Sequence, residues 1–177
     1  MKSALTFIIT ILLIANVYAY RSLQEIYDDA VGNGDYDKYI ELDPADEYNG
    51  DLSVFEGMNV YIDGNGAIIH GQEYYASISV YSSNLDIQNC VLVGGFAGIF
   101  ISNLSSANIV SNTIDGCESA AIKTYYIDHE TGTRIWDNIV ANCDYGIFII
   151  EDEHPEYIAF NNFYNIEEFP YAEYCPG

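Results

Sequence analysis

Short apolar motifs recur along the second half of the chain at nearly constant spacing, and this repetition limits the possible folds more than any other feature. In each motif an aliphatic residue is followed three positions later by Cys or Asn, and two positions after that by another apolar residue. The Cys and Asn positions are Cys90, Asn112, Asn138 and Asn161, which lie 22, 26 and 23 residues apart. Self-similarity at about 20–30 residues is typical of a solenoid, in which each repeat forms one coil.

The spacing of apolar residues inside each repeat indicates strands. A second row keeps the same period, and its members are Ile78, Ile99, Ile122 and Ile147. Apolar residues alternate over short β-branched runs, as in a half-buried strand and unlike a helix. Leucine-rich repeats share this period but need a Leu scaffold, and Leu is scarce here. We therefore expect an all-β solenoid, a parallel β-helix of about five coils with two or three short strands in each coil.

Equivalent residues of such a β-helix stack about 4.7–4.9 Å apart. Asn112, Asn138 and Asn161 should then form an amide ladder that bonds from coil to coil at a bend. Cys90 occupies the same position in its repeat and should point inward as a reduced thiol.

The stretch at residues 60–71, which contains Ile62-Asp63-Gly64-Asn65-Gly66, precedes these repeats. Together with them it resembles the right-handed parallel β-helix superfamily, the pectate-lyase-like fold. The resemblance covers roughly residues 22–166 and implies a right-handed single-stranded β-helix. Because the superfamily contains lyases, hydrolases, adhesins and non-catalytic modules, the resemblance implies the fold far more specifically than the function.

Residues 1–19 have the features of a signal peptide. Lys2 supplies a positive start, an apolar run covers residues 5–17, and Ala19 provides the small residue at the cleavage position. The run is shorter than the roughly 20 residues that a spanning helix needs. We expect cleavage after Ala19, a secreted chain and no membrane insertion afterwards; the other reading is a retained anchor.

The mature chain divides into three predicted segments. Residues 20–57 contain a capping α-helix at 22–32 and two opening strands. In that helix Ser22 is the N-cap, Glu25 its capping-box partner, and Gly32 the end. The β-helix repeats occupy residues 58–166, and residues 167–177 form a tail that closes the C-terminal end.

The charge of the chain excludes several classes of partner. It carries 27 acidic and 5 basic side chains, a formal net charge of −22. Such a surface repels nucleic acid and anionic membranes, so we expect neither as a partner. It also repels polyuronates unless cations intervene.

Aromatic residues at outward strand positions suggest carbohydrate binding. Phe100, Lys123, Tyr125 and Phe148 belong to the strands of the second row. Exposed rings on a flat β face can stack on sugar rings. In the alternative reading, the loops or the tail cover this face and make it a secondary core.

Lys123 also permits a catalytic reading. A lysine between apolar neighbours can act as the base of a β-elimination on a uronate. Ca²⁺ would then be held by carboxylates of the adjoining loops, namely Asp128, Glu130, Glu151 and Asp152. The alternative is a solvated lysine paired with nearby acids. The motifs of the hydrolases with this fold are absent from the sequence.

Cys117 and Cys143 fall on the same repeat position, so they should stack on adjacent coils. Export permits a disulfide between them, and two stacked buried thiols are the equally open alternative. Taken together, the sequence predicts a secreted, non-catalytic module that binds an extracellular polysaccharide or cell-surface glycan, or serves as a scaffold. The alternative is a small Ca²⁺-dependent polyuronate lyase.

Overall fold

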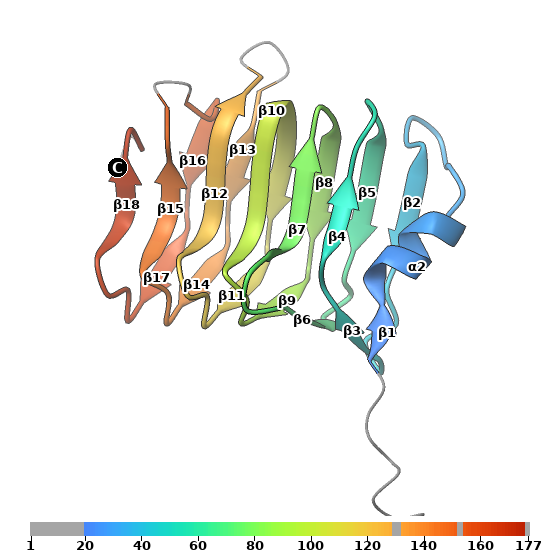
Figure 1. Ribbon diagram of the computed structural model, residues 1–177, viewed down its shortest axis with the longest axis horizontal. Coiled ribbons are helices and arrows are strands. Elements are labelled where there is room, and N and C mark those ends of the chain that lie inside the picture. Colours follow the sequence, from blue (N-terminus) through green and yellow to red (C-terminus); the bar gives the residue numbers. More distant parts are fainter. Residues whose placement is uncertain (1–19, 129–131, 152–153, 176–177) are drawn as a thin grey trace, which may run out of the picture.

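The computed structural model describes residues 20–128, 132–151 and 154–175. Within them the chain winds into a parallel β-solenoid, with the strands of successive turns side by side (Figure 1). The predicted signal peptide, residues 1–19, lies outside the described residues. None of the helices in the described ranges is long and apolar enough to span a membrane.

The strands form three faces, in each of which neighbouring strands are parallel. Face 1 consists of β1 (Arg21–Ser22), β3 (Glu47–Asn49), β6 (Ile68–His70), β9 (Val91–Val93), β11 (Thr113–Asp115), β14 (Ile139–Ala141) and β17 (Asn162–Tyr164). Face 2 consists of β4 (Leu52–Val54), β7 (Ala76–Tyr81), the first part of β10 (Ala97–Val110), β12 (Ala120–Ile127), β15 (Tyr145–Ile149) and β18 (Phe169–Glu173). Face 3 consists of β2 (Lys38–Glu41), β5 (Asn59–Asp63), β8 (Asn84–Gln88), the second part of β10, β13 (Arg134–Trp136) and β16 (Tyr157–Ala159).

The predicted all-β parallel solenoid is confirmed, with about six turns in place of five. Each full turn supplies strands to three faces, the larger of the two numbers expected for a repeat. The sequence left this number open because strands of three residues, such as β9 and β11, show only one inward side chain each. Period-2 alternation needs a longer run than that to be recognised.

Columns of aliphatic side chains fill the interior. Ile78, Ile99, Ile122 and Ile147 lie in register on face 2, and each is fully buried. On face 3, Ile62, Ile87 and Ile109 form an equivalent buried column. Both rows follow the spacing seen in the sequence, so the repeat places one apolar side chain above the next throughout the core.

Strand β10 turns a corner without interruption. Asn103 and Leu104 have φ values of 56° and 59°, and between Ser102 and Ser105 the pairing with β12 shifts register. Positive φ in two successive residues redirects the strand from face 2 to face 3. The outward side chains of face 2 therefore end at this corner, which forms one border of the site described below.

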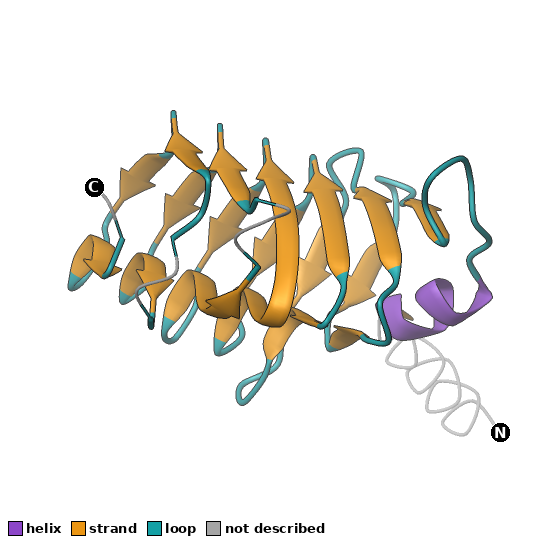
Figure 2. Cartoon of the chain, turned by 90° about the horizontal axis from the view of Figure 1, so that it is seen from above, coloured by secondary structure: helices purple, strands orange, loops and turns teal. Residues whose placement is uncertain are grey.

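Helix α2 (Leu23–Asp29) lies at the N-terminal end of the solenoid (Figure 2). As predicted, a helix caps this end: Leu23 and Tyr27 are buried in the core, and the Ser22 hydroxyl accepts a hydrogen bond from the Glu25 backbone N–H. The helix stops at Asp29, three residues before the expected Gly32, and Ala30 is its extended C-cap.

The tail differs from the expected closing flap. Residues of β18 pair in parallel with β15, so that Tyr145 lies opposite Phe169 and Ile147 opposite Tyr171. The segment thus continues the coil by one more strand.

Candidate functional site

The outward side chains of face 2 form the floor of a groove. Ser79 of β7, Phe100 of β10 and Lys123 of β12 lie in register on neighbouring strands. Inward residues of the same strands belong to the buried isoleucine column, so the backbone of the floor is fixed by the core. The groove therefore rests on a rigid part of the fold.

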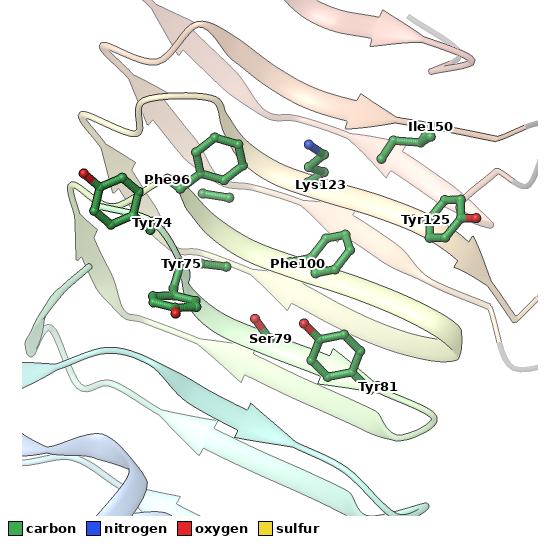
Figure 3. Close-up of a pocket in the computed structure, with 11 residues that line it drawn as sticks. Tyr74, Tyr75, Ser79, Tyr81, Phe96, Phe100, Lys123, Tyr125 and Ile150 are labelled. Carbon is green, nitrogen blue, oxygen red and sulfur yellow. The ribbon is translucent and has the colours of Figure 1, made fainter. Parts of the chain in front are cut away.

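Aromatic side chains form the walls of this groove, which has a volume of about 380 Å³. Figure 3 shows Tyr74, Tyr75 and Phe96 along one side, and Tyr81, Tyr125 and Ile150 along the other. Tyr74 and Tyr75 are 80% and 64% exposed. Large rings exposed together around a hollow indicate a binding surface, whereas scattered single ones do not.

Ring contacts hold part of the wall in place. Tyr81 stacks on Phe55 with ring centroids 5.0 Å apart and meets Phe100 edge-on at 6.0 Å. Such pairs contribute about 0.5–1.5 kcal/mol beyond the burial of their area. The rings of Tyr81 and Phe100 are thus ordered before any ligand arrives, which lowers the entropic cost of binding.

Lys123 supplies the positive charge of the groove. Its Nζ lies 5.4 Å from the ring centroid of Phe96 and 5.4 Å from that of Phe148. Both distances fall within the range of a cation–π contact. Among the described residues, those that line the groove include no Asp or Glu, and the ammonium group faces the hollow beside the rings of Phe96 and Phe148.

A second hollow of about 360 Å³ adjoins the groove and shares Tyr75, Ser79 and Tyr81 with it. Asp51 and Ser53 line its far side. The Oδ1 atom of Asp51 is buried and has no hydrogen-bond partner among the described residues, and burial raises the pKa of this carboxyl group. The residue also has a φ of 63°, which is uncommon for a residue other than glycine.

Three of the four predicted ligand-binding residues line the groove: Phe100, Lys123 and Tyr125. Phe148 lies next to Lys123 in register but outside the lining, where it packs edge-on against Tyr145 at 4.9 Å. The sequence analysis missed Tyr74, Tyr75 and Phe96. The adjacent pair of tyrosines was a visible signal, but these residues precede the strands, and the repeat pattern gave no position to them.

The structure describes only two of the four predicted calcium ligands. Glu130 and Asp152 lie outside the described residues. Asp128 and Glu151 are described, and neither lines the groove. The backbone N–H of Asp128 donates to the Ser105 carbonyl at 3.0 Å, which keeps this residue at the corner between faces 2 and 3.

The asparagine ladder runs between faces 3 and 1, away from the groove. The Oδ1 of Asn138 accepts from the backbone N–H of Asn112 at 3.0 Å, and that of Asn161 accepts from Asn138 at 3.1 Å. The Oδ1 of Asn112 accepts in the same way from Cys90, also at 3.0 Å. The four residues therefore lie in a single file with a structural role.

Cys117 and Cys143 stack on adjacent turns and are buried free thiols in the structure, as in the stacked-thiol alternative. Cys143 Sγ lies 3.2 Å from the Ala141 carbonyl oxygen of its own turn, and Cys117 Sγ lies 3.7 Å from the Gly94 carbonyl oxygen of the preceding turn. Hydrogen bonding to Cys143, with burial, raises the pKa of Cys117.

Comparison with known protein families adds one match. Residues 45–173 match the family described as "Periplasmic copper-binding protein (NosD)". The chain belongs to the NosD family. No curated protein and no solved structure matches it. The matched region begins at β3 and ends within β18, so the family relationship covers the groove and nearly the whole solenoid.

The described donor groups of this NosD-family chain do not come together as a copper site. Copper is bound by imidazole and by soft thiolate or thioether ligands. In the part of the chain that the structure describes, no three His, Cys, Asp or Glu side chains come together as metal ligands would. His70 bonds to Glu47 through Nε2 at 2.8 Å and stacks on Tyr20, while Cys117 and Cys143 are buried in the core.

Proposed function

We propose that this NosD-family chain is an exported, non-catalytic module that binds carbohydrate in the groove of face 2. The observation that carries the proposal is the set of aromatic rings around one cation on a rigid floor. Aromatic faces stack on the apolar faces of sugar rings, and tyrosine hydroxyls with Ser79 provide hydrogen-bond partners for sugar hydroxyls. Export is supported by the predicted signal peptide and by the periplasmic description of the family.

The lyase alternative has less support. Lys123 faces the groove, but a β-elimination on a uronate also needs a cation to neutralise the substrate carboxylate. The carboxylates proposed to hold Ca²⁺ do not line the groove where the structure describes them. Copper is not part of the proposal, since the described side chains do not assemble its ligands.

Binding to a panel of neutral and acidic extracellular oligosaccharides, measured by calorimetry, tests the proposal. We expect Tyr75→Ala to weaken binding by roughly 2- to 10-fold, because a stacked ring contributes about 0.5–1.5 kcal/mol. Tyr164→Ala is the matched control: its ring is 73% exposed on face 1 and lines no part of the groove. Equal loss in both variants, or no binding by the native chain, would contradict the proposal.

The same samples test the lyase alternative. Incubation with polyuronates and Ca²⁺ should produce no unsaturated uronate, detected by its ultraviolet absorbance. A Ca²⁺-dependent signal that Lys123→Ala abolishes would replace the binding module with an enzyme.

A further inference from the structure

The groove and the second hollow form one channel that runs along the solenoid axis. Its floor consists of Ser53, Ser79, Phe100 and Lys123, which occupy equivalent positions of β4, β7, β10 and β12. Adjacent strands are about 4.8 Å apart, so the floor extends about 14 Å from Ser53 to Lys123. A channel of this shape fits an elongated ligand that lies across the strands.

The two ends of the channel carry opposite charge. Of the described residues that line the two hollows, Lys123 is the only basic one and Asp51 is the only acidic one. The rings of Tyr75, Tyr81 and Phe100 separate them. A ligand aligned with this channel meets an ammonium group at one end, apolar rings in the middle and a carboxyl group at the other end.

The fold does not account for one carboxyl oxygen of Asp51, because the buried Oδ1 has no hydrogen-bond partner among the described residues and such an oxygen is destabilising. The positive φ of Asp51 is that of a corner residue, as at Asn103, and places it between β3 and β4. Gly50, its neighbour, packs against Ser77 so closely that a Cβ there would lie 2.9 Å from the Ser77 Cα. Asp51 lines the second hollow, where a hydroxyl of the ligand can donate to the part of its carboxyl group that faces the hollow.

From these observations, and on the basis of the carbohydrate binding proposed above, we infer that the channel selects an oligosaccharide with a single carboxylate. The acidic sugar lies at Lys123, the central rings stack on the aromatic walls, and a neutral sugar at the far end donates a hydroxyl to Asp51. A chain that carries a carboxylate on every ring is rejected, because its far end meets Asp51 within a surface of strong negative charge.

Calorimetric titration of the secreted full chain tests this inference with matched probes. For glucan, galactan and mannan oligosaccharides of equal length, three forms are compared: neutral, one terminal uronic acid, and every ring oxidised to the uronate. We expect the singly acidic form of at least one series to bind roughly 3- to 10-fold more tightly than its neutral form at low salt. The fully oxidised form should bind no more tightly than the neutral one.

Two variants assign the selectivity to the two ends. Lys123→Met keeps the apolar stem, and it should abolish the preference for the single acid. Asp51→Asn keeps the shape and tolerates a positive φ, and it should strengthen binding of the fully oxidised form. Arg134→Gln removes a positive charge on face 3, outside both hollows, and should change neither preference.

Each outcome is decisive. Equal binding of the neutral and singly acidic forms, or tightest binding of the fully oxidised form, overturns the inference and leaves carbohydrate binding intact. A preference for the single acid that Lys123→Met does not change also overturns it. If no series binds in any form, both the inference and the proposed function fail.

Discussion

The asparagine ladder shows how single polar side chains can be accommodated inside an apolar coil. Asn112 and Asn138 are 1% and 0% exposed. The Asn138 side chain accepts from the Asn112 backbone N–H and donates to the Ile109 carbonyl oxygen at 2.9 Å. A buried polar group is costly without partners, but here each amide also satisfies backbone groups that the bend leaves unpaired. The ladder therefore stabilises the bend between faces 3 and 1.

We predict that Asn138→Leu lowers the free energy of unfolding by about 2–4 kcal/mol. The substitution leaves a backbone N–H and a backbone carbonyl without partners, and each unsatisfied buried group costs about 1–3 kcal/mol. Urea denaturation followed by far-ultraviolet circular dichroism measures the loss. Asn162→Leu, on an exposed position of β17, is the control and should change the stability by less than about 0.5 kcal/mol. A similar loss in both variants would contradict a specific role of the ladder.

At this scale the sequence predicted the ladder and the floor of the groove, but not its walls. The nearly constant repeat spacing was enough to place Asn112, Asn138 and Phe100, because residues one turn apart become neighbours in any parallel solenoid. Tyr74 and Phe96 lie outside the strands, where the backbone follows no period. Their positions depend on how one turn packs against the next, and a single sequence does not reveal that.

Among the elements, helix α2 shows how local signals and tertiary contacts combine. The N-cap at Ser22 follows from the sequence. The end of the helix at Asp29 depends on contacts with residues outside the helix. Lys38 Nζ donates to the carbonyl oxygens of Asp28 and Ala30, at 2.9 and 2.8 Å, and thereby satisfies groups at the C-terminal end. Asp28 and Asp29 also place negative charge where the helix dipole is unfavourable to it, so continuation to Gly32 gains nothing.

We predict that Leu23→Ala destabilises the chain by about 2–4 kcal/mol, the usual cost of removing a fully buried leucine side chain. The loss arises because Leu23 covers the first turn of the core, so the variant leaves a cavity beneath the helix. Thermal and urea denaturation measure the change in the free energy of unfolding. Val31→Ala, at a side chain that is 77% exposed, should behave like the native chain. Native-like stability of Leu23→Ala would mean that the helix does not cap the core.

For the whole molecule, the excess of acid is the dominant electrostatic property. With 27 acidic and 5 basic side chains, few carboxylates find a cationic partner. The ion pairs Arg21–Asp46 and Arg134–Glu156, at 2.8 and 2.9 Å, are exposed and contribute little. Repulsion among the remaining carboxylates opposes the compact state, and salt screens this repulsion over about 10 Å at 0.1 M.

We therefore predict that the chain becomes more stable as salt is added. Raising NaCl from low millimolar to about 0.15 M shortens the screening length from roughly 30 Å to 8 Å, which weakens repulsion between distant carboxylates more than attraction within a short ion pair. The melting temperature at pH 7, followed by circular dichroism, should rise by several degrees and then level off. Choline chloride should give the same curve as NaCl, because screening depends on ionic strength and not on the cation. A fall in melting temperature with salt would mean that attractive pairs outweigh the repulsion, and a rise with NaCl alone would indicate a bound cation.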